Sequence, residues 1–95
     1  MTAAKIADNP EAARFEVRID GRLAGFAQYQ LRGGTIVFTH TEIQPEFEGK
    51  GLGSVLARAA LDGARDTGLT VVPECLFIRG YIESHPEYTE LLESR

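Results

Sequence analysis

The first half of the chain alternates between apolar and polar residues. Residues 15–19 alternate with the two-residue period of a strand that buries one face, and Asp20-Gly21 follows as a hairpin turn signal. A second alternating run covers residues 23–31 and ends at the turn pair Gly33-Gly34. Because the next run, TIVFTHTEI at residues 35–43, is rich in β-branched and aromatic residues, the three runs predict a three-stranded antiparallel meander.

After Pro45 the apolar residues change to the period of a helix. They recur at helical spacing from about Gly51 to Thr67, and one face carries Leu52, Val55, Leu56, Ala59 and Ala60. Gly68 is placed as the helix stop signal. LTVVP at residues 69–73 is almost wholly apolar, which is typical of a strand buried on both faces in a parallel pair. Strand, helix and strand in this order predict a right-handed crossover.

The last part of the chain predicts short helices. Residues 75–85 form a short helical pattern weakened by Gly80, and Pro86 begins a last turn or two. The predicted fold class is α+β: an antiparallel meander of three strands, a crossover helix, one parallel strand and C-terminal helices. We expect residues 1–12 to be a flexible N-terminus and residues 13–95 to form a single domain.

The composition narrows the classes of protein that fit the chain. Apolar residues make up 43% and charged residues 25%, which is ordinary for a soluble globular protein, and no apolar run could span a bilayer. The net charge of -4 argues against binding to nucleic acid and suits a cationic small molecule or peptide. Residues 1–12 lack the features of a signal peptide, and the single Cys75 cannot form an intrachain disulfide. We therefore expect a cytoplasmic protein without membrane contacts.

Three glycines precede the predicted helix at every second position: Gly49, Gly51 and Gly53. Without a Cβ, their backbone N–H groups can turn towards a ligand, and the helix N-terminus adds the positive end of its dipole. Such a loop is an anion site, and a pyrophosphate fits it. The alternative interpretation is that the glycines only permit a tight turn and close packing.

Three phosphate-binding motifs compete for this loop. The Walker A motif requires Ser or Thr after Gly-Lys, whereas Gly51 follows here, so the motif is poorly supported. The dinucleotide fingerprint fits better, because Ser54 is a small third residue and Glu74 lies about 20 residues further on. However, residues 45–48 separate the strand from the glycines, and the chain is too short for two βαβαβ halves. The third candidate is the coenzyme A loop of acetyltransferases.

The stretch EIQPEFEGKGLGSVL, residues 42–56, resembles motif A of the GNAT superfamily of N-acetyltransferases. In that motif a proline-containing linker follows a strand, and Gln/Arg-x-x-Gly-x-Gly/Ala opens the helix that binds coenzyme A pyrophosphate. The likeness covers about residues 35–92. With Cys75 after the Val72-Pro73 step and with the tail that begins at His85-Pro86, the chain resembles the small single-domain subgroup sometimes called YjdJ-type.

The resemblance implies acetyl-CoA as a co-substrate and no metal. The residues it assigns to coenzyme binding are Ile43, Glu48, Gly49, Lys50, Gly51, Leu52, Gly53 and Ser54. One of them departs from the superfamily pattern, because Glu48 stands where Gln or Arg is expected and puts an anion where phosphates arrive. Lys50 supplies a positive charge close by.

Cys75 is the first candidate catalytic residue. It follows the carboxyl end of the parallel strand, and the glycine loop follows the neighbouring strand, so both should face one crevice. Cys75 could attack acetyl-CoA to form an acetyl-enzyme thioester. It could instead line the pantetheine channel or relay a proton while the amine attacks directly, which is the route we favour. A third interpretation is a small buried hydrophobic residue.

His40 is the candidate base that deprotonates the acceptor ammonium. Strand alternation places it with Ile36 and Phe38, which also allows a histidine satisfied in or beside the core. We assign a structural role to His85. We expect an acidic rim near the crevice that attracts a cationic amine, formed by Glu42, Glu46, Glu48 and Glu74.

These expectations add up to a GNAT-like N-acetyltransferase that moves an acetyl group from acetyl-CoA to an amine. The acceptor would be a small molecule or a protein lysine, and the protein would be a monomer or a weak homodimer. The alternative is a coenzyme A-binding module without catalysis of its own that needs a partner. A dinucleotide-binding fragment is the third interpretation.

Overall fold

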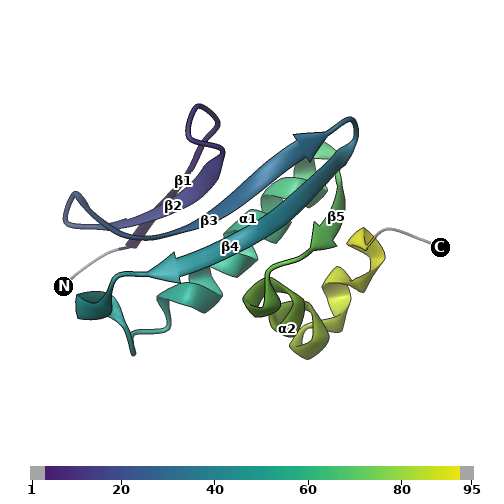
Figure 1. Ribbon diagram of the computed structural model, residues 1–95. Coiled ribbons are helices and arrows are strands. Elements are labelled where there is room, and N and C mark those ends of the chain that lie inside the picture. Colours follow the sequence, from purple (N-terminus) through teal and green to yellow (C-terminus); the bar gives the residue numbers. More distant parts are fainter. Residues whose placement is uncertain (1–3, 93–95) are drawn as a thin grey trace.

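The computed structural model describes residues 4–92, which form one five-stranded sheet and its helices (Figure 1). The strands are β1 (Ala4–Asn9), β2 (Arg14–Ile19), β3 (Arg22–Arg32), β4 (Thr35–Ile43) and β5 (Thr70–Pro73). The helices are α1 (Leu52–Thr67) and α2 (Leu76–Ser84), with the 3-10 helices η1 (Pro45–Phe47) and η2 (Pro86–Leu91). Among the described residues, no helix has the length and apolar character needed to span a bilayer.

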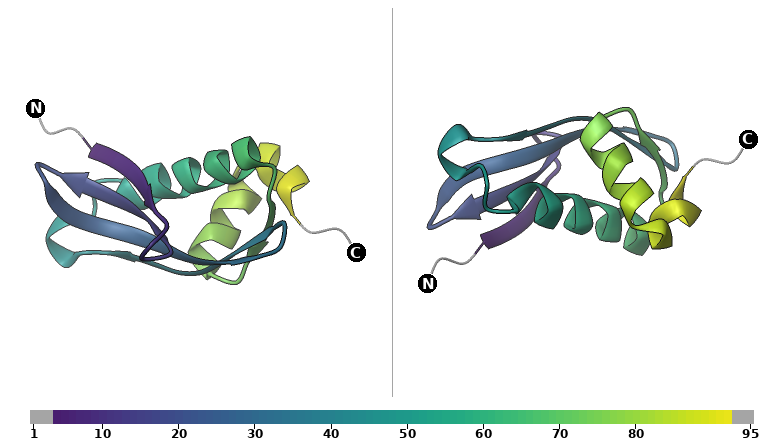
Figure 2. Two further views of the ribbon diagram at one scale, coloured as in Figure 1. Left: turned by 90° about the horizontal axis from the view of Figure 1, so that it is seen from above. Right: turned by 90° about the horizontal axis from the view of Figure 1, so that it is seen from below.

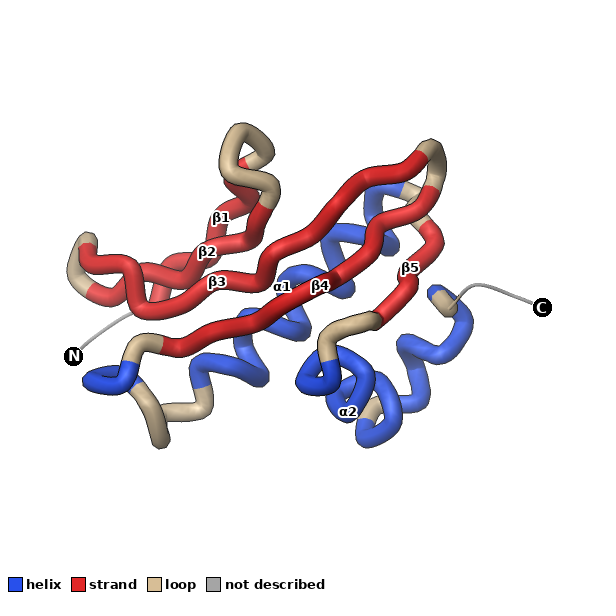
Figure 3. Tube along the Cα trace, viewed as in Figure 1, coloured by secondary structure: helices blue, strands red, loops and turns tan. Residues whose placement is uncertain are grey.

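The sheet confirms the predicted α+β class. Its strands follow the order β1-β2-β3-β4-β5; the first four are antiparallel, and β5 pairs with β4 in parallel through the α1 crossover (Figure 3). Helix α1 runs along one face of the sheet, while the opposite face, called here the open face, carries no helix of the described residues (Figure 2). Any helix-built site must therefore lie on the α1 side or at the edge of the sheet.

The core forms between α1 and the sheet. Helix α1 buries a stripe of small and branched residues: Leu52, Leu56, Ala57, Ala60, Leu61 and Ala64. The three alanines let the helix approach the sheet closely, where it meets Phe15, Val17 and Phe38. The predicted apolar face was wrong for Val55, which is 43% exposed, because the buried stripe is centred on Leu56 and Ala60.

Strand β1 was not predicted. It lies within residues 1–12, the expected flexible start, and pairs with β2 along its whole length, so the sheet has four antiparallel strands instead of three. Most of its side chains are exposed, and only Ile6 and Asn9 are partly buried. This edge strand is held by backbone hydrogen bonds to β2 and buries few side chains. Its sequence therefore shows no alternation of apolar and polar residues from which it could be predicted.

Two further features of β4 shape the site. Phe38 and His40 pair with consecutive residues of β3, so Thr39 is the extra residue of a β-bulge. The pairing of β4 with β5 ends at Phe38 and Pro73, after which the chains diverge. The edge of β4 from Thr39 to Ile43 therefore has no strand partner on the β5 side among the described residues.

The open face holds a buried carboxylate, Glu16, which is only 6% exposed. It accepts hydrogen bonds from Arg14 Nε at 2.7 Å, Arg18 Nη2 at 3.1 Å and Asn9 Nδ2 at 3.1 Å. The bond from Arg14 is the main cause that lowers the pKa of Glu16 below its ordinary value of 4.5, although burial opposes it. The ionised form of Glu16 is therefore stabilised in the folded protein.

This arrangement predicts an acid-dependent loss of stability. A carboxylate with a lowered folded pKa contributes stability that is present above its unfolded pKa and is lost as pH falls through the folded value. We expect the free energy of unfolding of the wild type to fall more steeply below pH 4.5 than that of Glu16→Gln. Urea unfolding at several pH values measures the slopes, and parallel curves for the two proteins would contradict the assignment.

Candidate active site

The glycine loop forms a pocket at the N-terminus of α1. Gly49 and Gly51 have φ values of 82° and 75°, which side chains with a Cβ rarely adopt, and Gly51 is the N-cap of the helix. No side chain caps the helix, so its first N–H groups are available to a ligand. The pocket has a volume of about 320 Å³ and is lined by Ile43, Phe47, Glu48, Gly49, Gly51, Leu52, Gly53, Ser54 and Phe77. We call it the glycine pocket.

The glycine pocket brings together seven of the eight residues predicted to bind coenzyme. Lys50 is the exception, because it is exposed and does not line the pocket. Glu48 does line it, so an acidic residue borders the pocket that the sequence predicted as an anion site. Sequence reasoning missed Phe47 and Phe77, which gave no signal beyond their apolar character.

Gly53 has a different function from the two glycines before it. It lies in the first turn of α1, and a Cβ at this position would come within 2.7 Å of Cζ of Phe77. The missing side chain therefore lets the ring of Phe77, from the first turn of α2, rest against α1. Close packing explains Gly53, and the positive φ angles explain why the turn has glycine at positions 49 and 51. Both observations agree with the alternative interpretation, a tight turn with close packing, as well as with an anion site.

Cys75 is the N-cap residue of α2 and is 8% exposed. Its backbone N–H donates to the Phe38 carbonyl oxygen at 2.8 Å, and its Sγ donates to Thr41 Oγ1 at 3.2 Å. The thiol thus lies against the unpaired edge of β4, and two residues later Phe77 lines the glycine pocket. Cys75 itself does not line the glycine pocket, so the expected crevice shared by the thiol and the loop stays a prediction.

His40 lies on the other side of the sheet. The sequence pattern grouped it with Ile36 and Phe38, but the bulge at Thr39 inverts the alternation and turns His40 to the open face. Its side chain is 55% exposed; Nε2 lies 3.1 Å from Glu42 Oε1, and its ring centroid lies 6.0 Å from that of Phe26. The structure therefore does not place His40 on the same face as the thiol.

The four glutamates expected to form an acidic rim are distributed over separate surfaces. Glu42 pairs with His40 on the open face, and Glu46 forms an ion pair with Arg22 at the start of β3. Glu48 borders the glycine pocket, whereas Glu74 borders another pocket. Among the described residues, no three His, Cys, Asp or Glu side chains are grouped as metal ligands.

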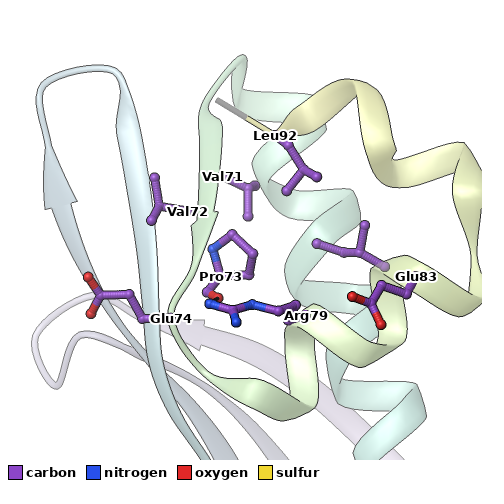
Figure 4. A pocket seen from close by; sticks show the side chains of 8 residues that line it. Val71, Val72, Pro73, Glu74, Arg79, Glu83 and Leu92 are labelled. Atoms are coloured by element: carbon purple, nitrogen blue, oxygen red, sulfur yellow. Dashed lines mark hydrogen bonds between the residues drawn. The ribbon is translucent and has the colours of Figure 1, made fainter. Parts of the chain in front are cut away.

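Another pocket lies between β5 and α2 (Figure 4). It measures about 390 Å³ and is lined by Val71, Val72, Pro73, Glu74, Arg79, Ile82, Glu83 and Leu92. Arg79 crosses it and donates through Nη2 to the Pro73 carbonyl oxygen at 3.2 Å. No residue of the glycine loop lines it, so its size alone does not make it the active site.

An antiparallel meander, a crossover helix that begins at a glycine loop, and a parallel strand that diverges from its neighbour define a GNAT-like fold. A family model described as GCN5-related N-acetyl-transferase matches residues 14–91. The chain belongs to this family. The YjdJ-type subgroup stays a prediction.

Individual relatives agree with the family assignment. The human protein NATD1 is 32% identical over 84 residues, which cover 84% of this chain and 74% of the relative. The mouse protein NATD1 is 29% identical over 93 residues, which cover 94% and 84%.

Solved structures show the fold. A GCN5-like putative N-acetyltransferase from Staphylococcus aureus has a TM-score of 0.72 at 20% identity, covering 96% of this chain and 89% of that one. A ribosomal-protein-alanine N-acetyltransferase from Brucella melitensis has a TM-score of 0.55 at 19% identity, covering 86% and 62%.

Proposed function

We propose that this protein binds acetyl-CoA and transfers the acetyl group to an amine. The observation that carries the proposal is the glycine pocket, which joins the uncapped N-terminus of α1 to Ile43 at the end of the unpaired β4 edge. The N-terminus of α1 suits an anion, and the unpaired edge of β4 suits an extended chain that carries amides. Coenzyme A combines both chemistries in one molecule.

The residues present fit the coenzyme. Free N–H groups from Gly49 to Ser54 would donate hydrogen bonds to the diphosphate, as helix N-termini do to anions. The pantetheine arm carries two amides, and the β4 edge from Thr39 to Ile43 offers backbone donors and acceptors without a strand partner. An extended chain adds to such an edge as a strand would. The thioester would then lie near Cys75 and Thr41.

The reaction is an acyl transfer that ends in an amide. The unprotonated amine nitrogen attacks the thioester carbonyl carbon, the C–S bond breaks, and the sulfur leaves with a proton. Since the Cys75 thiol donates its hydrogen to Thr41 Oγ1, it acts in this scheme as a neighbour of the thioester or as a proton relay. His40 and its partner Glu42 would deprotonate only an amine that approaches from the open face.

The route through Cys75 is tested by the mass of the intact protein. For direct transfer we expect acetyl-CoA to add no acetyl group to the protein, and Cys75→Ala to lose less than about tenfold in kcat/KM, which is about 1.4 kcal/mol. The Cys75 side chain, which is 8% exposed, then affects turnover only through its packing and its hydrogen bond. A gain of one acetyl group that disappears in Cys75→Ala, together with lost turnover, would instead establish the covalent route.

A non-catalytic coenzyme A-binding module is the second candidate. It is favoured by the open face, which has no helix among the described residues to enclose an acceptor (Figure 2). Coenzyme binding without turnover on a broad panel of amines, including lysine peptides, would support the module. Turnover of any of these amines would support the transferase. The acceptor, small molecule or protein lysine, follows from the same panel.

A further inference from the structure

The linker between β4 and the glycine loop is held against the start of β3. The backbone N–H of Gln44 donates to the Ala24 carbonyl oxygen at 2.7 Å. Beside this bond, a Cβ at Gly25 would come within 2.5 Å of Ile43 Cδ1, so the missing side chain lets the end of β4 lie close to β3. These contacts fix the point at which the chain leaves the sheet.

Arg22, the first residue of β3, makes the next contact with the linker. Its guanidinium forms an ion pair with Glu46 and lies over the ring of Phe47, with Arg22 Cζ 5.3 Å from the ring centroid. Both partners belong to η1, and the turn that precedes Arg22 lies at the same end of the sheet as η1 (Figure 1). One side chain of the β2–β3 hairpin therefore holds η1 by two kinds of contact.

Phe47 connects this contact to the glycine pocket. It is 8% exposed and lines the pocket, and only Glu48 separates it in sequence from Gly49. The loop that follows has no side-chain cap, and glycine gives its backbone wide conformational freedom. Such a loop takes its position from the elements at its two ends. These are α1, which is packed in the core, and η1, which Arg22 holds.

We propose that Arg22 is a positioning residue that holds η1 and thereby sets the place of Phe47 and the glycine loop for coenzyme binding. The inference rests on the proposed function, because it concerns the same pocket. Arg22 does not line this pocket, so it acts through Phe47 and does not touch the ligand. The Arg22 and Glu46 side chains are 65% and 54% exposed, so the ion pair is weak in water and the contact with the Phe47 ring adds to it.

The test compares two arginines of the same strand. Arg32, the last residue of β3, is also exposed and donates to Gln30 Oε1 of its own strand at 2.8 Å. Arg22→Ala and Arg32→Ala each remove one positive charge from an end of β3, but only Arg22→Ala removes the contacts with η1. Arg32→Ala is therefore the control that is matched for charge.

Calorimetric titration with acetyl-CoA gives the first readout. We expect Arg22→Ala to weaken binding by about threefold to tenfold, the size of an exposed ion pair together with a cation–π contact. Arg32→Ala should weaken it by less than about twofold, because salt screens a distant exposed charge. An affinity of Arg22→Ala equal to that of Arg32→Ala would overturn the inference.

The Glu46→Ala background tests whether Arg22 acts through η1. The ion pair is already lost in this background, so adding Arg22→Ala should reduce the affinity by a smaller factor than it does in the wild type. If Arg22 acted only through its charge, the factor would be the same in both backgrounds. That result would contradict a positioning role.

A readout without ligand separates the inference from the proposed function. In isotope-labelled protein, the amide resonances of Gly49 and Gly51 report the geometry of the loop, and that of Gly68 reports the opposite end of α1. Arg22→Ala should shift the first two and leave the third unchanged, and unshifted loop resonances would refute the inference. If the wild type bound no acetyl-CoA, the proposed function would fail, while these resonances would still decide whether Arg22 positions the loop.

Discussion

Replacing Gly51 by valine is expected to weaken acetyl-CoA binding at least about a hundredfold while the chain stays folded. Gly51 is the N-cap of α1 with a φ of 75°, and it lines the glycine pocket. A β-branched residue is strained there, so the loop must change its backbone and turn its N–H groups away from the diphosphate. Losing two such bonds to a charged group, at about 1.5–3 kcal/mol each, accounts for the expected effect.

The same substitution at Gly68 is the matched control for Gly51→Val. Gly68 ends the same helix with a φ of 76°, so Gly68→Val adds comparable backbone strain at the opposite end of α1. Thermal unfolding should show similar destabilisation of both variants, and calorimetry should show lost binding only for Gly51→Val. If Gly51→Val kept its affinity, or if Gly68→Val lost as much, the loop would be a turn without a binding function.

Phe38→Ala is expected to lower the free energy of unfolding by about 3–5 kcal/mol. The Phe38 ring is fully buried and packs against Phe15 and Tyr29, with centroids 6.4 Å from each. Its removal leaves a cavity between α1 and the middle of the sheet. Because small domains are stable by about 5–15 kcal/mol, the variant should be close to unfolding, and urea titration measures the loss.

Leu31→Ala provides the comparison for Phe38→Ala. Leu31 is an apolar residue of β3 but is 60% exposed, so its truncation should change stability by less than about 0.5 kcal/mol. A loss below about 1 kcal/mol for Phe38→Ala would show that the core closes around the cavity. Phe38, which lies at the last β4–β5 pair, would then contribute less to the free energy of unfolding than its burial indicates.

Elements with a strong local signal were predictable from the sequence. The helix expected from about Gly51 to Thr67 is α1, Leu52–Thr67, because its apolar spacing and its stop glycine Gly68 act within a few residues of one another. The last expected strand, residues 69–73, is β5 at Thr70–Pro73 for the same reason. In both, the residues that define the element also form its boundaries.

Features that depend on partners far along the chain were not predictable. The bulge at Thr39 arises from pairing with β3, and nothing in TIVFTHTEI marks the extra residue. Alternation therefore assigned His40 to the wrong face. Gly25 shows the same limit, because a Cβ there would come within 2.6 Å of the Glu42 carbonyl oxygen, and this close approach of two strands is visible only in the folded chain.

The candidate site divides in the same way. The positive φ angles of Gly49 and Gly51 follow from residue type, so the glycine pocket could be anticipated. The contact of Gly53 with Phe77 joins residues 24 positions apart in sequence, and only the packing of α2 on α1 produces it. The sequence therefore predicted the loop as an anion site, and the structure added the residues that surround the loop.

The bulge in β4 has a consequence for how this strand can change. The extra residue Thr39 reverses the alternation of inward and outward side chains. Even-numbered residues face the core before it, and odd-numbered residues face that side after it. If Thr39 were lost, Phe38 and His40 would be adjacent and would still pair with consecutive residues of β3, so His40 would stay on the open face and Thr41 beside the Cys75 thiol. The loss of one residue at the bulge would therefore keep both faces of β4 as they are, whereas the same loss in a regular strand would exchange its two faces.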